Sequence, residues 1–131
     1  MKISSFATDL DLEENGVWVD IGDGARLKLA RIGNPAYTKL QRELAKPLRQ
    51  QLRRNSVPQD KLLDIQLQLL SRTVLLDWEG LEDDKGKKIK YSTENAFQLM
   101  RDLKDFRRLV EETADEQATF ARIEAEEVGN G

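Results

Sequence analysis

The chain has 131 residues, of which 34% are charged and 39% hydrophobic, and its formal net charge is −3. This length suits one domain with a modest core. Cysteine and histidine are absent, which excludes disulfides, zinc–thiolate sites and the side chain that most often acts as a general base near neutral pH. The sequence also lacks an apolar run long enough for a membrane span and a signal peptide after Met1. We therefore expect a cytoplasmic protein with no membrane partner.

A β-hairpin is the first regular element that the sequence predicts. Residues 1–15 precede it, and we expect them to be loosely ordered. Val17 to Ile21 are rich in strand formers. Gly22-Asp23-Gly24 supplies positive φ for the turn, and Arg26 to Arg31 form the return strand. Because an isolated hairpin is marginally stable in water, we expect it to pack on helices or to pair with another chain.

The first predicted helix begins at Asn34-Pro35, because asparagine caps helices and proline suits the first turn. Apolar residues recur along it at a mostly four-residue spacing, and Pro47 should kink or break it. A second set of residues at steps of three and four shares one helical face. This basic stripe consists of Lys39, Arg42, Lys46, Arg49 and Arg53.

Three further helices follow in the predicted fold. The second, from about Gln59 to Leu76, is apolar nearly all round, so we expect it to be the buried core. Ser92 caps the third. The fourth carries a narrow apolar seam from Phe106 to Phe120. Both the leucine-rich second helix and this seam are candidate surfaces for a partner.

The expected fold class is mainly α (α+β), with an N-terminal β-hairpin followed by about four helices. We expect a single domain over residues 16–123. The segment 124–131 is acidic and glycine-containing, and we expect it to be a flexible tail.

Two aromatic residues stand at the ends of a polar loop between the second and third helices. Trp78 precedes the loop, Asp84-Lys85-Gly86 forms its turn, and Tyr91 follows it. Each of the two aromatic side chains can bury about 150–250 Å². We therefore expect the loop to be docked on the domain by Trp78 and Tyr91.

Charge is distributed unevenly along the chain. Residues 31–61 hold eight Lys or Arg and two Asp or Glu, a net charge of +6. Residues 111–131 hold one Lys or Arg and seven Asp or Glu, a net charge of −6. Such asymmetry is typical of interaction surfaces. The two charged segments could meet within one chain or between copies. One hypothesis is that the basic stripe binds Glu111, Glu112, Asp115 and Glu116 of a neighbouring copy, which gives a homo-oligomer. The alternative is two solvated faces that never meet.

The sequence offers little to an active site. Glu82-Asp83-Asp84 lacks the alternating ligand spacing of a calcium loop, and no glycine-rich phosphate loop occurs. Serine and threonine have no histidine to activate them. We therefore expect no enzyme, no catalytic residue, no metal site and no cofactor.

The segment from Val74 to Ala96 resembles the tail assembly chaperones of long-tailed bacteriophages and prophages. Members often carry a W-x-G element, here Trp78 to Gly80, followed by [IL]-x-[YF]-[ST]-x-E-N, here Ile89 to Asn95. The resemblance implies a protein that binds the tape-measure protein, recruits tail-tube protein, and is absent from the mature virion. It also implies work in the cytoplasm of a bacterial host.

Two other functions stay open at this point. One is a structural phage component, such as a head–tail connector or a tail protein that stays in the particle. The other is a nucleic-acid-binding accessory protein, in which the basic stripe tracks phosphates. The negative net charge and the acidic C-terminal segment oppose nucleic-acid binding.

Overall fold

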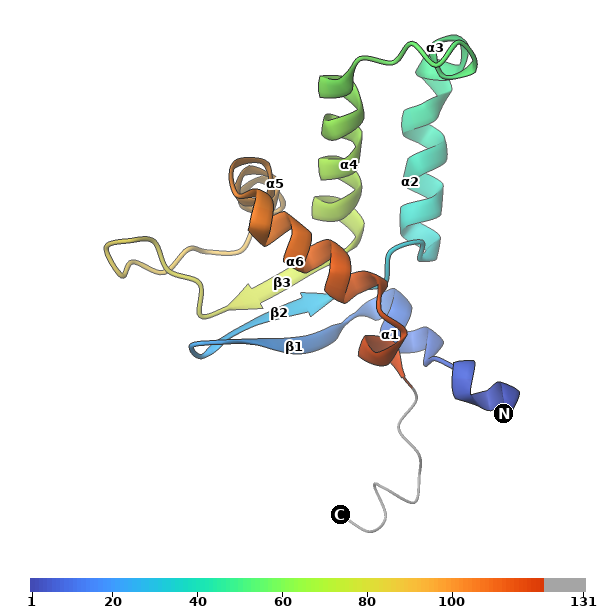
Figure 1. Cartoon of the computed structure of the whole chain (residues 1–131). Helices are drawn as coiled ribbons and strands as arrows, with labels where there is room; N and C mark the ends of the chain where they lie inside the picture. Colours follow the sequence, from blue (N-terminus) through green and yellow to red (C-terminus); the bar gives the residue numbers. More distant parts are fainter. Residues whose placement is uncertain (122–131) are drawn as a thin grey trace.

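The computed structural model describes residues 1–121, which form a small α+β domain (Figure 1). A three-stranded antiparallel sheet, in the order β1-β2-β3, lies beneath the helices. The expected fold class is therefore confirmed. The predicted tail 124–131 and the last two residues of the predicted domain lie outside the described residues. Within residues 1–121, no helix has the length and apolar character needed to cross a membrane.

The predicted hairpin forms strands β1 (Val17–Gly22) and β2 (Ala25–Leu29). Its apolar residues alternate with polar ones, so that Leu27 and Leu29 of β2 are fully buried on one face of the sheet. On the other face, Arg26 lies over the ring of Trp18 and pairs with Glu79 at 2.8 Å. One face of the sheet therefore carries the core, and the other faces solvent.

The third strand, β3 (Leu75–Glu79), corrects the prediction that the second helix continues to Leu76. Helix α4 spans Gln59–Thr73 and stops there. β2 offers an unpaired backbone edge at this point, and β3 pairs with it in antiparallel register, Leu27 opposite Trp78. This long-range pairing overrides the local helical pattern. β2 is therefore the central strand, and the hairpin pairs within its own chain.

Helices α5 (Thr93–Asp102) and α6 (Lys104–Asp115) cover the sheet together with α4. The side chain of Ser92 caps α5 as predicted, and the chain breaks the helix at Leu103 before α6 begins. Both helices contribute a buried face to one continuous core. That core consists of Leu27, Leu29, Leu67, Leu70, Val74, Leu75, Trp78, Ala96, Met100, Val110 and Ala114.

Helix α6 ends at Asp115 instead of running through Phe120, which corrects the fourth predicted helix. The carbonyl oxygens at its end find partners outside the helix. The amide of Ile32 donates to Ala114 at 3.0 Å, and the hydroxyl of Thr119 donates to Thr113 at 2.8 Å. A short 3-10 helix, η3 (Gln117–Phe120), then turns Phe120 fully into the interior.

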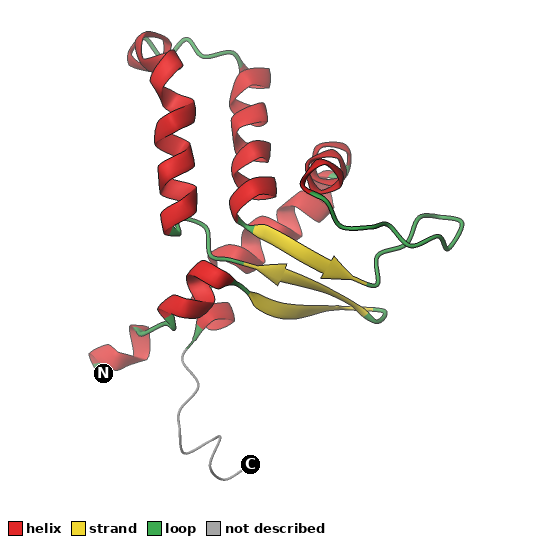
Figure 2. Cartoon of the chain, turned by 180° about the vertical axis from the view of Figure 1, so that it is seen from behind, coloured by secondary structure: helices red, strands yellow, loops and turns green. Residues whose placement is uncertain are grey.

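The helices between β2 and β3 form an arm that projects from the sheet (Figures 1 and 2). Helix α2 (Pro35–Ala45) runs beside α4, and the two are joined at the far end through η2 (Lys46–Leu48) and α3 (Arg49–Arg53). We call residues 35–73 the arm. The predicted break at Pro47 is confirmed, because α2 ends two residues before it.

The burial of α4 differs from the prediction of an element buried all round. Its C-terminal half is in the core, where Leu67, Leu69 and Leu70 are buried. Its N-terminal half extends beyond the domain, and Leu62 is 44% exposed. The reason is geometric: α4 is longer than the body it packs on, so only α2 is available to cover its outer half.

The N-terminal residues form η1 (Ile3–Phe6) and α1 (Leu10–Asn15). The carboxylate of Asp9 caps α1. The amide of Asp9 also donates to the carbonyl of Phe120 at 2.8 Å, so the two ends of the described chain lie together. The loose ordering expected for residues 1–15 stays a prediction.

Asn34 is the residue that joins the arm to the body. Its side chain is 4% exposed, and its Oδ1 accepts from the amide of Tyr37 at 3.0 Å, which caps α2 as predicted. Its Nδ2 donates to the carbonyl of Arg31 at 2.8 Å and to that of Thr73, the last residue of α4, at 2.9 Å. One buried amide therefore holds the start of α2 against the end of α4.

Candidate functional site

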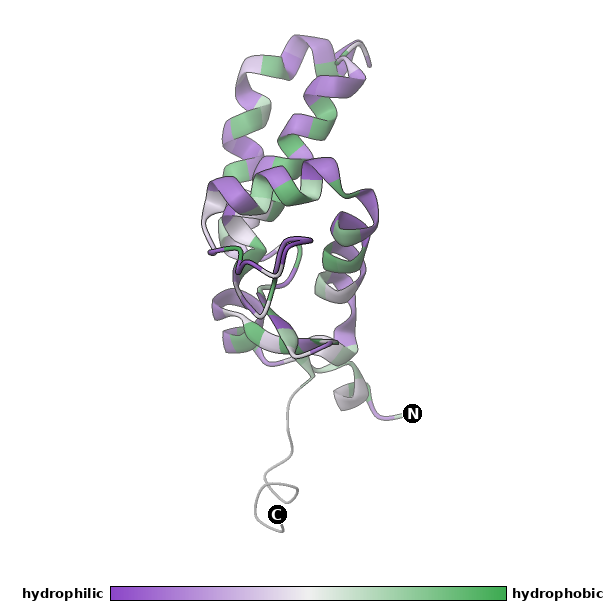
Figure 3. Ribbon diagram, turned by 90° about the vertical axis from the view of Figure 1, so that its left-hand side faces the viewer, coloured by the Kyte–Doolittle hydropathy of each residue, from purple (hydrophilic) through white to green (hydrophobic). Residues whose placement is uncertain are grey.

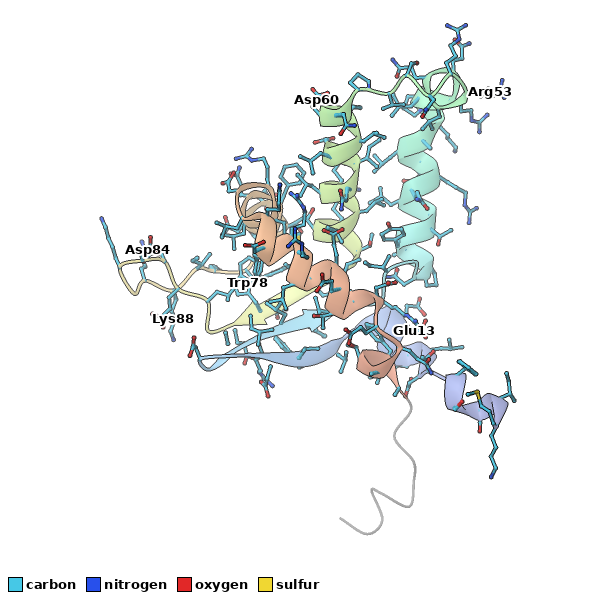
Figure 4. All side chains as sticks on the ribbon, viewed as in Figure 1. Glu13, Arg53, Asp60, Trp78, Asp84 and Lys88 are labelled. Atoms are coloured by element: carbon cyan, nitrogen blue, oxygen red, sulfur yellow. The ribbon has the colours of Figure 1, made fainter. Side chains whose placement is uncertain are left out.

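The prediction that the basic stripe shares one helical face is wrong, because the helix ends before Pro47. Lys39 and Arg42 lie on α2, Lys46 on η2, and Arg49 and Arg53 on α3. All five residues of the stripe are exposed, and within residues 1–121 none of them takes part in an ion pair. Figure 4 places Arg53 at the far end of the arm, away from the sheet. Among residues 1–121, the stripe therefore presents positive charge that no carboxylate of the described chain neutralises.

The arm also exposes apolar surface. Leu40 and Leu48 are buried, whereas Leu52 of α3 is 46% exposed and Leu62 of α4 is 44% exposed. Figure 3 shows hydrophobic and hydrophilic residues mixed along both helices of the arm. Leu62 borders a hollow of about 350 Å³, which Gln59, Asp60, Leu63 and Gln66 also line. The hollow thus combines two leucines with polar side chains, and its leucine side is suited to an apolar anchor of another protein.

The predicted acidic residues lie at the C-terminal end of α6 and just after it. Glu112, Asp115 and Glu116 are exposed, and none forms an ion pair within residues 1–121. The structure does not bring them into ion pairs with the basic stripe of the same chain. Arg31 is the cation that approaches this end, and its guanidinium donates to the carbonyl of Asp115 at 3.5 Å.

Trp78 and Tyr91 dock the loop on the sheet, as the sequence predicts. Their rings meet edge to face, with centroids 5.0 Å apart. The indole Nε1 of Trp78 donates to the carbonyl of Ile89 at 2.7 Å, and the Tyr91 hydroxyl donates to the carbonyl of Leu75 at 2.8 Å. Trp78 is only 5% exposed. Its polar atom and its ring are thus both used inside the chain.

The other residues of the motif also have structural roles. Gly80 has φ +79°, and a Cβ there would lie 2.6 Å from the carbonyl oxygen of Gly24, so only glycine fits this close approach. The carboxylate of Asp83 accepts from the amides of Lys85 and Lys87, both at 2.9 Å, and closes the turn. The segment that carries the resemblance therefore builds a rigid loop.

The candidate aromatic residues differ from the charged candidates in burial. Trp78 and Phe120 are buried, and Tyr91 and Phe106 are half-buried against the core. The charged candidates are all exposed. Sequence analysis missed Leu52 as an exposed residue, because its spacing matches that of the buried leucines before it. The signal was Pro47, which ends α2 and places Leu52 on the separate helix α3.

In the described part of the chain, no group of three or more potential ligand residues could hold a metal ion.

Two tyrosines have raised pKa values. Tyr37 is half-buried beside Glu111, and its pKa is raised mainly by burial and also by the negative charge of Glu111. Burial likewise raises the pKa of Tyr91, and the charge of Asp77 adds to the shift.

Comparison with known proteins finds one family. The family model described as YdaY prophage protein matches residues 32–130, more than half of the chain. The match covers the arm, β3, the docked loop and α6. No curated protein and no solved structure matches the chain.

Replacing Trp78 should test its anchoring role. We expect Trp78→Ala to lower the free energy of unfolding by about 3–5 kcal/mol, because it leaves a cavity between the loop and the sheet. Trp18→Ala is the matched control: Trp18 lies on the solvent face of the sheet under Arg26, and its loss should cost less. Urea denaturation measures both, and equal losses would contradict the assignment.

Alkaline pH should weaken the protein through Tyr91. Because its pKa is raised above the ordinary value of 10.0 in the folded state, the folded chain holds the phenol proton more tightly than the unfolded chain. The protonated phenol of Tyr91 therefore adds to the free energy of unfolding. This stabilisation is complete below pH 10 and is lost as pH rises through the pKa of the folded state. We expect Tyr91→Phe to flatten the fall in urea midpoint above pH 10, and Tyr37→Phe to remove part of the remainder. If Tyr91→Phe leaves the dependence of the urea midpoint on pH unchanged, ionisation of Tyr91 does not control this loss of stability.

Proposed function

This chain is a member of the YdaY prophage protein family, and from that premise we propose that it is a tail assembly chaperone. In this proposal it binds the tape-measure protein, recruits tail-tube protein, and acts through protein–protein contacts without catalysis. It works in the cytoplasm of the bacterial host and leaves before the virion is complete. Family membership supports a prophage role, and the resemblance of residues 74–96 supports the chaperone role.

The observation that carries the proposal is the arm. A helical hairpin projects from a small body and carries exposed leucines and cations that form no ion pair with the described residues. A single chain gains no stability from leaving Leu52 and Leu62 in water. The arm is therefore best explained as a surface that another polypeptide covers.

The chemistry of the arm also describes its client. A helix-in-groove contact needs an apolar anchor on the client, and the hollow beside Leu62 provides its receptor. The exposed cations of α2 favour acidic residues on the flanks of that anchor. A long amphipathic helix with acidic flanks, as expected of a tape-measure segment, fits both requirements.

Co-expression with a prophage tape-measure protein tests the client. We expect the two to co-purify, and Leu62→Asp to lower the captured amount about tenfold, the effect of losing one buried anchor. Leu103→Asp is the matched control: Leu103 is 52% exposed but lies between α5 and α6, so capture should persist. Equal capture by both variants, or none by the unaltered chain, would refute the proposal.

The exposed basic stripe also favours one second candidate, a nucleic-acid-binding accessory protein. Phosphates would contact the same cations and would require no leucine. A DNA gel shift at physiological salt that is lost on reversing Arg42, Lys46 and Arg49, without any client capture, would select this candidate. Detection of the chain in purified virions would instead select a structural tail or connector protein.

A further inference from the structure

A second hollow lies where α2, α4 and α6 meet at the base of the arm. It measures about 360 Å³. Ile32, Tyr37 and Leu70 give it apolar walls, and Glu112 and Asp115 stand at its rim. We call this hollow the acidic groove. It combines an apolar floor with fixed negative charge, which is the complement of a basic, partly apolar partner.

The charge of the groove is not neutralised within the described residues. Glu111, which also borders the groove, is engaged by Gln66 at 2.5 Å and by Arg107 at 3.7 Å. Glu112 and Asp115 form no ion pair in residues 1–121. A neighbouring hollow toward the start of α6 is lined by Lys104, Arg107 and Arg108, and Gln66, Glu111 and Glu112 line both hollows. The negative end of the groove is therefore confined to the last turns of α6.

The complementary surface is the end of the arm. Arg49, Leu52 and Arg53 are all exposed and share the five-residue helix α3. We call these three residues the arm tip. An exposed leucine between two guanidinium groups matches a groove with apolar walls and two carboxylates. Arginine is suited to this pairing, because its planar fork binds carboxylates and stacks on aromatic rings such as that of Tyr37.

We infer that the arm tip of one copy occupies the acidic groove of a second copy. Leu52 packs on Ile32 and Tyr37, which are half-buried, while Arg49 and Arg53 pair with Glu112 and Asp115. This inference rests on the proposed function, because it gives a chaperone the means to line up several copies along one client.

The tip cannot reach the groove of its own chain. The groove lies at the base of α2, and the tip lies beyond the other end of that helix (Figures 1 and 4). The eleven residues of α2 span about 16 Å. Because tip and groove are different patches, each copy offers one of each, and the contact is heterologous and repeatable.

Charge exchange provides the test. In light scattering at low salt we expect the unaltered chain to exceed the mass of one protomer and to dissociate as salt rises. The tip variant Arg49→Glu with Arg53→Glu, and the groove variant Glu112→Lys with Asp115→Lys, should each associate about tenfold more weakly. Mixed together, the two variants place opposite charges at both contacts, and association should return.

A matched control separates this contact from general charge effects. Lys87→Glu with Lys88→Glu makes the same change in net charge as the tip variant, on the exposed loop before α5, and should associate like the unaltered chain. A single-protomer mass at low salt, a mixture that stays dissociated, or a control that dissociates equally would each overturn the inference. Circular dichroism confirms that every variant is folded.

The same variants distinguish this contact from the chaperone role. The tip variant keeps Leu62 and its hollow, so capture of the tape-measure protein by a single copy should persist. Capture without self-association would refute only the inference. Self-association that follows the charge exchange, without any capture, would refute only the proposed client.

Discussion

The buried amide of Asn34 is the contact on which the arrangement of the molecule depends. It uses its oxygen to cap α2 and its two N–H groups to bind carbonyls before α2 and at the end of α4. Leaving any of these groups unpaired in the interior would be costly. The arm can therefore project from the sheet as a rigid hairpin, although little of the body covers its outer half.

The sheet is completed by the same connection. Where α4 ends beside Asn34, the chain enters β3 directly and pairs with β2. Trp78 and Tyr91 then fasten the following loop to the sheet, and the backbone leads into α5. The body is a compact platform, and in the proposed function it supports the base of the arm, so that the arm tip and the acidic groove stay at opposite ends of α2.

The fold places the positive and the negative side chains in different parts of the molecule. The cations of the stripe lie along the arm, and the carboxylates of Glu112 and Asp115 lie at its base. The length of the arm separates these opposite charges within one chain, and in the proposed self-association each meets its counterpart on another copy.

Local chemistry in the sequence determined the caps at Asn34 and Ser92, the hairpin at Gly22 to Gly24, the break at Pro47 and the anchoring pair Trp78 and Tyr91. Each of these features depends on residues close in the sequence, so the sequence pattern alone is sufficient to predict it. Tertiary structure decided that residues 75–79 form a strand, because pairing with β2 outweighs helical periodicity. It also decided that Leu62 is exposed while Phe120 is buried, because only packing shows where the body ends. The acidic groove likewise exists only where three helices meet.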